Sequence, residues 1–144
     1  MKLPDEALAR ADLWLEYVVR DMQAMRLLRG EPLMEAAVCF HAQQAVEKAL
    51  KAYLAALSED DIPRTHDLRQ LYSLALERGG EKLPDTGLPY LNQHAVASRY
   101  PDAEFPTEEE AEEAVEFATE IVTSIYEALG IDSEDTHTSC SEDS

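Results

Sequence analysis

The chain has 144 residues, and its 12 lysines and arginines stand against 30 aspartates and glutamates, which gives a formal net charge of −18. Its length fits one domain, and 45% hydrophobic with 29% charged residues is typical of a globular protein rather than a disordered or fibrous one. Phosphate backbones and anionic lipid headgroups repel such a chain, so nucleic-acid binding over the whole surface is disfavoured, while a local basic patch stays open.

The two ends and the cysteines narrow the cellular setting. No apolar run approaches the roughly 20 residues that a membrane helix needs, and the first residues, Met1 to Glu6, carry acids and no apolar core of a secretory signal. The two cysteines, Cys39 and Cys140, do not form a disulfide framework. We therefore expect a cytoplasmic protein without a membrane segment.

The first half of the chain predicts two long helices, over residues 5–29 and 32–57. One apolar stripe with three- and four-residue spacing marks the buried face of the first: Leu8, Ala11, Leu15, Val18, Met22 and Met25. Pro32 suits the first turn of the second helix. Small side chains recur along one ridge of it, at Ala42, Ala45, Ala49, Ala52 and Ala56. Because such a ridge lets another helix approach closely, we expect the second helix to contact several neighbours.

The second half predicts three more helices, over residues 65–78, 89–97 and 107–129. We expect Thr65 to cap the third helix, and Thr107 and Glu110 to form the capping box of the last one. Since no segment alternates like a strand, the predicted fold is all-α. We expect an antiparallel up-and-down bundle of four long helices and one short helix. The bundle would span residues 1–130, followed by an acidic, disordered tail over 131–144.

Three segments go beyond what a helical bundle needs. They read Phe-His-Ala-Gln-Gln-Ala-Val-Glu-Lys-Ala-Leu-Lys over 40–51, Thr-His-Asp-Leu over 65–68 and Ser-Arg-Tyr-Pro-Asp over 98–102. In identity, order and spacing they resemble the HEPN family, a small helical domain of bacteria and archaea. The resemblance implies a bundle similar to the C-terminal domain of aminoglycoside nucleotidyltransferases, commonly dimeric and often paired with a minimal nucleotidyltransferase. The resemblance also suggests ribonuclease activity, because many members are ribonucleases whose site is an arginine followed after four to six residues by histidine.

That ribonuclease spacing is absent here. The nearest arginine upstream of His41 is twelve positions away, Arg64 lies only two before His66, and neither remaining histidine fits. Our first interpretation is therefore a non-catalytic accessory module that associates with a nucleotidyltransferase-type partner and binds a nucleotide. A divergent ribonuclease toxin of a toxin–antitoxin pair and a ligand-free dimerisation domain are the alternatives. We expect the accessory module, like the dimerisation domain, to form a homodimer.

The candidate ligand-binding residues are His41, Gln44, Lys48 and Arg99. The first three share one polar edge of the second helix, where Lys48 offers positive charge to a phosphate, and the arginine fork suits the same group. The competing interpretations are a helix-boundary histidine and a salt bridge from the arginine to the last helix. Supporting roles are expected for Gln43, Thr65, His66, Asp67 and Tyr100. Gln43 falls in the apolar arc, so its amide needs an internal partner such as a loop carbonyl. No metal-ligand spacing or cofactor motif is present, so no metal and no cofactor are expected.

Overall fold

A computed structural model describes residues 3–95 and 104–132, and in these ranges the regular structure is entirely helical. The all-α fold class is thereby confirmed. Within the described residues, five α-helices and one 3-10 turn follow each other: α1 (Asp5–Leu28), α2 (Glu35–Leu57), α3 (Leu68–Glu77), α4 (Leu88–Asn92), η1 (Gln93–Ala95) and α5 (Glu108–Leu129).

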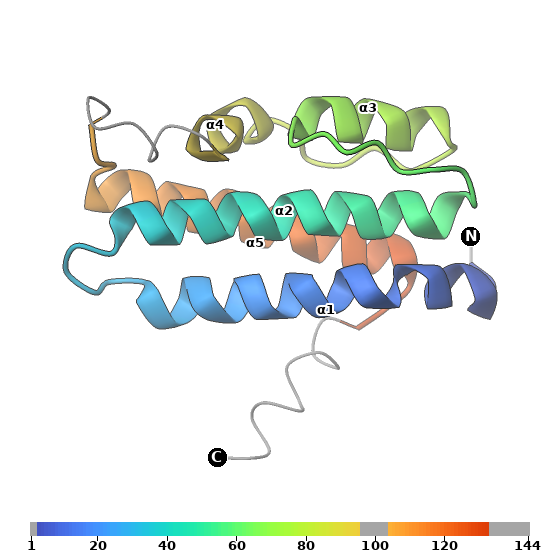
Figure 1. The fold of residues 1–144 in the computed structure, drawn as a ribbon, viewed down its shortest axis with the longest axis horizontal. Coiled ribbons are helices and arrows are strands. Elements are labelled where there is room, and N and C mark those ends of the chain that lie inside the picture. The colour runs from blue at the N-terminus through green and yellow to red at the C-terminus, as the bar shows by residue number, and fades with distance from the viewer. Residues whose placement is uncertain (1–2, 96–103, 133–144) are drawn as a thin grey trace, which may run out of the picture.

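Helix α2 is the centre of the bundle. It runs between α1 on one side and the α3–α4 layer on the other, with α5 behind it (Figure 1), and it packs against each of them. The predicted ridge of alanines is fully enclosed, since Ala42, Ala45, Ala49 and Ala52 have no exposed surface. Leu50 is buried beside it. Because 15 of the 23 residues of α2 are buried, any charged group on this helix needs a partner inside the protein.

Helix α2 begins three residues later than the sequence predicts. The expected start at Pro32 is wrong because Leu33, which follows it, has a φ of 68° and cannot continue a right-handed helix. Gly30, with a φ of 82°, takes the left-handed conformation that ends α1. The turn between the two long helices therefore occupies more residues than predicted.

Helix α3 is also shorter than predicted, and the role expected for Thr65 is wrong. The N-cap is Asp67, whose carboxylate accepts a hydrogen bond from the Arg69 amide at 3.0 Å. Thr65 instead supports the residue that caps the helix, because its hydroxyl oxygen accepts a hydrogen bond from the Asp67 amide at 3.1 Å. With ten residues, α3 is four residues shorter than the predicted range 65–78, and α4 has five residues.

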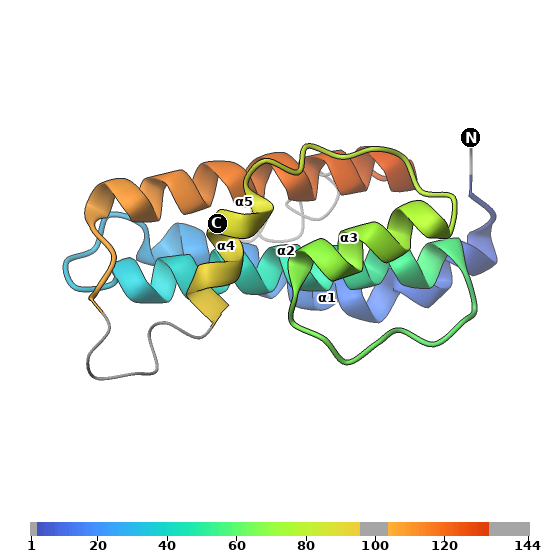
Figure 2. The ribbon, with the colours of Figure 1, turned by 90° about the horizontal axis from the view of Figure 1, so that it is seen from above.

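The connection over 58–67 determines which residues meet. It leaves the end of α2, runs back alongside the bundle and reaches α3 near the middle of α2 (Figure 2). Its last residues are therefore brought over a part of α2 that lies about twenty positions earlier in the chain.

Helix α5 matches its prediction closely. Thr107 and Glu110 form the expected capping box, with their reciprocal hydrogen bonds at 3.1 and 2.9 Å. Gly130 ends the helix with a φ of 75°. Of the tail predicted over 131–144, residues 133–144 lie outside the described part of the chain.

Among the described residues, no helix combines the length and the apolar character needed to span a bilayer.

Candidate functional site

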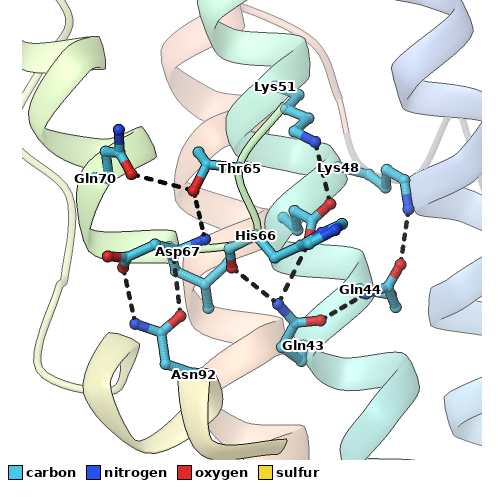
Figure 3. A network of polar contacts seen from close by, with 11 residues as sticks. Gln43, Gln44, Lys48, Lys51, Thr65, His66, Asp67, Gln70 and Asn92 are labelled. Atoms are coloured by element: carbon cyan, nitrogen blue, oxygen red, sulfur yellow. Dashed lines mark hydrogen bonds and ion pairs between the residues drawn. The ribbon is translucent and has the colours of Figure 1, made fainter. Parts of the chain in front are cut away.

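A carboxylate buried in the middle of α2 organises the polar residues of the bundle. Glu47 is only 1% exposed, yet each of its oxygens has a charged or ionisable partner. Its Oε1 atom lies 3.0 Å from Nδ1 of His66, in the connection before α3, and its Oε2 accepts a hydrogen bond from Nζ of Lys51 at 3.2 Å (Figure 3). Lys51 is itself 7% exposed, so this ion pair is largely removed from water.

The environment of Glu47 keeps its carboxyl group ionised. Burial alone raises the pKa of Glu47, but the hydrogen bond from His66 and the positive charge of Lys51 act against burial and together bring the pKa below its ordinary value of 4.5. An ionised carboxylate only accepts hydrogen bonds. The proton between the two groups therefore resides on Nδ1 of His66, which assigns the tautomer of the neutral ring.

A chain of amide groups extends from Glu47 along the same helix. Gln43, which is fully buried, donates weakly from Nε2 to Oε1 of Glu47 and to the backbone carbonyl of His66, both at 3.4 Å. Its Oε1 accepts from Gln44 at 2.7 Å, and Oε1 of Gln44 accepts from Nζ of Lys48 at 2.8 Å. The loop carbonyl that the buried amide was expected to need is that of His66. We call these residues the Glu47 network: Gln43, Gln44, Glu47, Lys48, Lys51 and His66.

Two lysines of the Glu47 network also contact aromatic side chains of α1. The ammonium group of Lys51 lies 5.5 Å from the ring centroid of Trp14, and that of Lys48 lies 5.9 Å from the ring centroid of Tyr17. Both are cation–π contacts. Because the two helices run antiparallel, residues later in α1 pair with residues earlier in α2. The cations of α2 are thus held against aromatic rings of α1, along what we call the α1–α2 seam.

Lys48 differs from the other cations of this region. Its one hydrogen-bond partner is the neutral amide of Gln44, and among residues 3–95 and 104–132 no carboxylate lies within ion-pair distance of its Nζ. Lys51, by contrast, is paired with Glu47. In a chain of net charge −18, Lys48 therefore places a positive charge without an ion-pair partner at a partly exposed position, next to the half-exposed ring of Tyr17.

The remaining candidate residues lie in other surroundings. His41 lies further along the α1–α2 seam, nearer the start of α2. Its Nδ1 atom is 2.9 Å from Oδ1 of Asp21, and it does not join the Glu47 network. Thr65 donates to Gln70 at 3.1 Å, and Asp67 accepts from Asn92 of α4 at 3.0 Å, so both residues organise the start of α3.

Two candidates cannot be placed in the site. Arg99 and Tyr100 lie outside the described residues, and so does the salt bridge to the last helix considered for Arg99.

Sequence reasoning missed the residues on which the network depends. Neither Glu47 nor Lys51 is among the predicted site residues, and both are buried. Their spacing of four along an apolar helix is the pattern of an i, i+4 ion pair and could have indicated their contact. Trp14 and Tyr17 had no comparable pattern, because their pairing depends on how α1 and α2 align.

We found no stronger candidate site among the other thiol, metal-ligand and groove features of the described residues. Burial raises the pKa of the Cys39 thiol to about 12, which leaves it without thiolate reactivity. No group of three histidine, cysteine or acidic side chains in the described ranges is arranged to hold a metal ion. A groove of about 740 Å³ follows another face of α1; its charged lining residues are Asp12, Glu16 and Arg20, and no residue of the Glu47 network lines it.

A comparison with known protein families supports the resemblance carried by the site's residues. The family model of the HEPN domain matches residues 11–129, most of the chain. The chain belongs to the HEPN family. No curated protein and no solved structure matches it. The matched range includes the whole Glu47 network, so this network is part of the HEPN domain itself.

The charge of Glu47 makes the stability of this HEPN domain depend on pH. Because folding lowers the pKa of Glu47 below 4.5, its stabilising contribution is complete above that pH and is lost as the pH falls through the lower, folded value. Glu47→Gln leaves the ammonium of Lys51 without a counter-charge. At pH 7 we expect this variant to lose about 3 kcal/mol of unfolding free energy.

Urea denaturation at several pH values measures this difference. The gap between wild type and Glu47→Gln should narrow as the pH falls below 4.5. Glu120→Gln, at an exposed position of α5, is the control and should leave the curve nearly unchanged. A gap that is constant from pH 7 to pH 3 would contradict the ionised, paired state of Glu47.

Proposed function

We propose that this HEPN domain is a non-catalytic binding module that holds a nucleotide on the α1–α2 seam. The observation that carries the proposal is the uncompensated charge of Lys48. It is positioned by Gln44 and faces no described carboxylate, although the chain as a whole is strongly acidic. Lysine ammonium groups bind phosphate in proteins as point charges.

The neighbouring aromatic ring favours a nucleotide over a simple anion. Tyr17 is 48% exposed and lies beside the Lys48 ammonium group. A base that stacks on an accessible aromatic ring contributes about 1–3 kcal/mol. One ligand with both a base and a phosphate would therefore use both residues, whereas a phosphate alone would use only the lysine.

The non-catalytic part of the proposal rests on the sequence. None of the four histidines follows an arginine at the ribonuclease spacing, which leaves the divergent-toxin alternative without residues for that chemistry. We further propose a cytoplasmic location, from the sequence features described above, and, from the family alone, a nucleotidyltransferase-type partner. We propose in addition that Arg99, which lies outside the described residues, contributes a further cationic contact to the nucleotide phosphate.

A nucleotide titration followed by NMR tests the binding site. Addition of AMP to the full chain should shift the backbone signals of Tyr17, Gln44 and Lys48. Lys48→Ala should weaken binding about tenfold, or about 1.4 kcal/mol, because it removes the charge that meets the phosphate. Lys82→Ala makes the same change at an exposed position between α3 and α4 and should bind like wild type. Equal affinities for the two variants, or no shifts at all, would support the ligand-free alternative.

We also propose that the domain forms a homodimer through apolar side chains that α1 leaves uncovered. Leu13 is 62% exposed and Leu27 is 70% exposed, and Leu33 in the following turn is 88% exposed. Leu13 and Leu27 are about four turns apart in α1 and lie on the same face of the helix, and exposed apolar side chains along one helix face favour association with another protein. Two chains of charge −18 nevertheless repel each other, so the interface must leave the glutamate-rich start of α5 in solvent.

Sedimentation equilibrium at low and high salt tests the dimer. Added salt should strengthen association, because it screens the repulsion within a Debye length of about 8–10 Å. Leu27→Asp should weaken the dimer without unfolding the chain, since this side chain is already exposed. A monomer at high micromolar concentration in both salts would contradict the dimer, and a dimer weakened by salt would contradict the role of repulsion.

A further inference from the structure

His66 contacts α2 through both its ring and its backbone, although its side chain is exposed. Its side chain is 75% accessible, yet its ring nitrogen Nδ1 lies 3.0 Å from Oε1 of Glu47. Its backbone carbonyl accepts from Nε2 of Gln43, one turn earlier in α2. Two consecutive turns of a buried helix thus hold the residue by its ring and by its backbone. Capping α3 does not require this arrangement, because Asp67 supplies the cap.

The contact with Glu47 determines what the free edge of the ring can do. Since the ionised carboxylate keeps the proton on Nδ1, the Nε2 atom of the neutral ring carries a lone pair and accepts hydrogen bonds. A lone pair cannot donate to a phosphate oxygen. A phosphate dianion can therefore bind at this edge only when Nε2 takes up a proton.

The charges around His66 favour that uptake when an anion is present. On α2, Glu47 and Lys51 form a pair whose charges cancel, and Lys48 carries one positive charge. The ring of His66 and the side chain of Lys48 lie on the same side of α2 (Figure 3). Protonation of His66 would raise the local charge from one to two, and Glu47 would stabilise the imidazolium ion directly.

The other titratable groups near the ring do not reverse this balance. Asp67, the next residue, is engaged by the Arg69 amide at the start of α3 and by Asn92 of α4, and the hydrogen bond from Asn92 is the main cause that holds its pKa below the ordinary value. Arg64, in the same connection, adds a positive charge at an exposed position. From α1, Tyr17 contributes an uncharged ring beside Lys48.

We propose that His66 is the second phosphate contact of the nucleotide site, and that binding of a phosphomonoester dianion adds one proton from solvent to its Nε2 atom. Glu47 is the positioning residue, because it fixes the tautomer and stabilises the charged ring. The inference rests on the proposed nucleotide site and identifies its ligand class. A phosphomonoester carries two negative charges and matches Lys48 together with protonated His66, whereas a phosphodiester carries one and matches Lys48 alone.

Imidazole nitrogen NMR on the full chain tests the proton directly. In the protein without ligand, His66 should show the Nδ1–H tautomer that its contact with Glu47 fixes. Inorganic phosphate should convert its Nε2 signal to the protonated form. An Nε2–H tautomer in the free protein, or an Nε2 signal that phosphate leaves unchanged, would overturn the proposal.

Calorimetry with AMP and its cyclic phosphodiester tests the ligand class. In two buffers of different ionisation enthalpy, AMP binding should take up about one proton per site and be about tenfold tighter than binding of the cyclic compound. His66→Asn should abolish the uptake and reduce the preference to near unity, while Lys82→Ala should change neither. Glu47→Gln, where circular dichroism shows it folded, should bind AMP with less proton uptake, and unreduced uptake would overturn the role of Glu47.

The two proposals can fail separately. AMP binding that needs Lys48 but takes up no proton would overturn the role of His66 and leave the nucleotide site intact. Protonation of His66 by phosphate, without any contribution of a base at Tyr17, would overturn the nucleotide assignment and retain the phosphate contact.

Discussion

The burial of a carboxylate in the most enclosed helix is the constraint on which the rest of this structure depends. An isolated charge in such a place costs several kcal/mol, and only close, well-oriented partners compensate for it. Glu47 obtains one partner from its own helix, Lys51, and one from a distant part of the chain, His66. The second contact fixes where the connection over 58–67 must run. It thereby helps to position the start of α3 at Leu68, which lies two residues beyond His66 and one beyond the cap, Asp67.

The same constraint produces the exposed functional groups. Because α2 is covered on most sides by apolar packing, its polar side chains gather at the edge toward α1 and the connection. There Glu47 uses the charge of Lys51, and the amides of Gln43 and Gln44 satisfy each other. Lys48 is left as a positioned but unneutralised cation, and His66 as an exposed ring in one tautomer. Structural and functional roles are thus divided among neighbouring residues of a single polar network.

The long helices could be predicted because their signals are local. The apolar stripe of the first, the alanine ridge of the second and the capping box of the last each depend on residues within a few turns. The predicted starts of α2 and α3 were wrong, because they depend on the backbone conformation of one residue and on the hydroxyl group of another. Leu33 delays α2 through a positive φ, and Thr65 supports Asp67 instead of capping α3 itself.

The site was predictable only in part, for a related reason. The family segments drew attention to Gln43, Gln44, Lys48 and His66, which the structure brings together. Glu47 could not be recognised as their centre, because its contact with His66 spans nineteen positions and depends on the path of the connection. The pairing of Lys48 with Tyr17 likewise depends on the alignment of two helices, which periodicity within one helix does not contain.

A double-mutant cycle between Glu47 and Lys51 tests the central ion pair most directly. Unfolding free energies of Glu47→Gln, Lys51→Met and the double variant would be measured in urea at pH 7. If the two charges compensate each other in the interior, the double variant will be less destabilised than the sum of the single variants, with a coupling energy of about 1–3 kcal/mol. Additive effects, within about 0.5 kcal/mol, would show that the charges do not depend on each other and would contradict the organising role of Glu47.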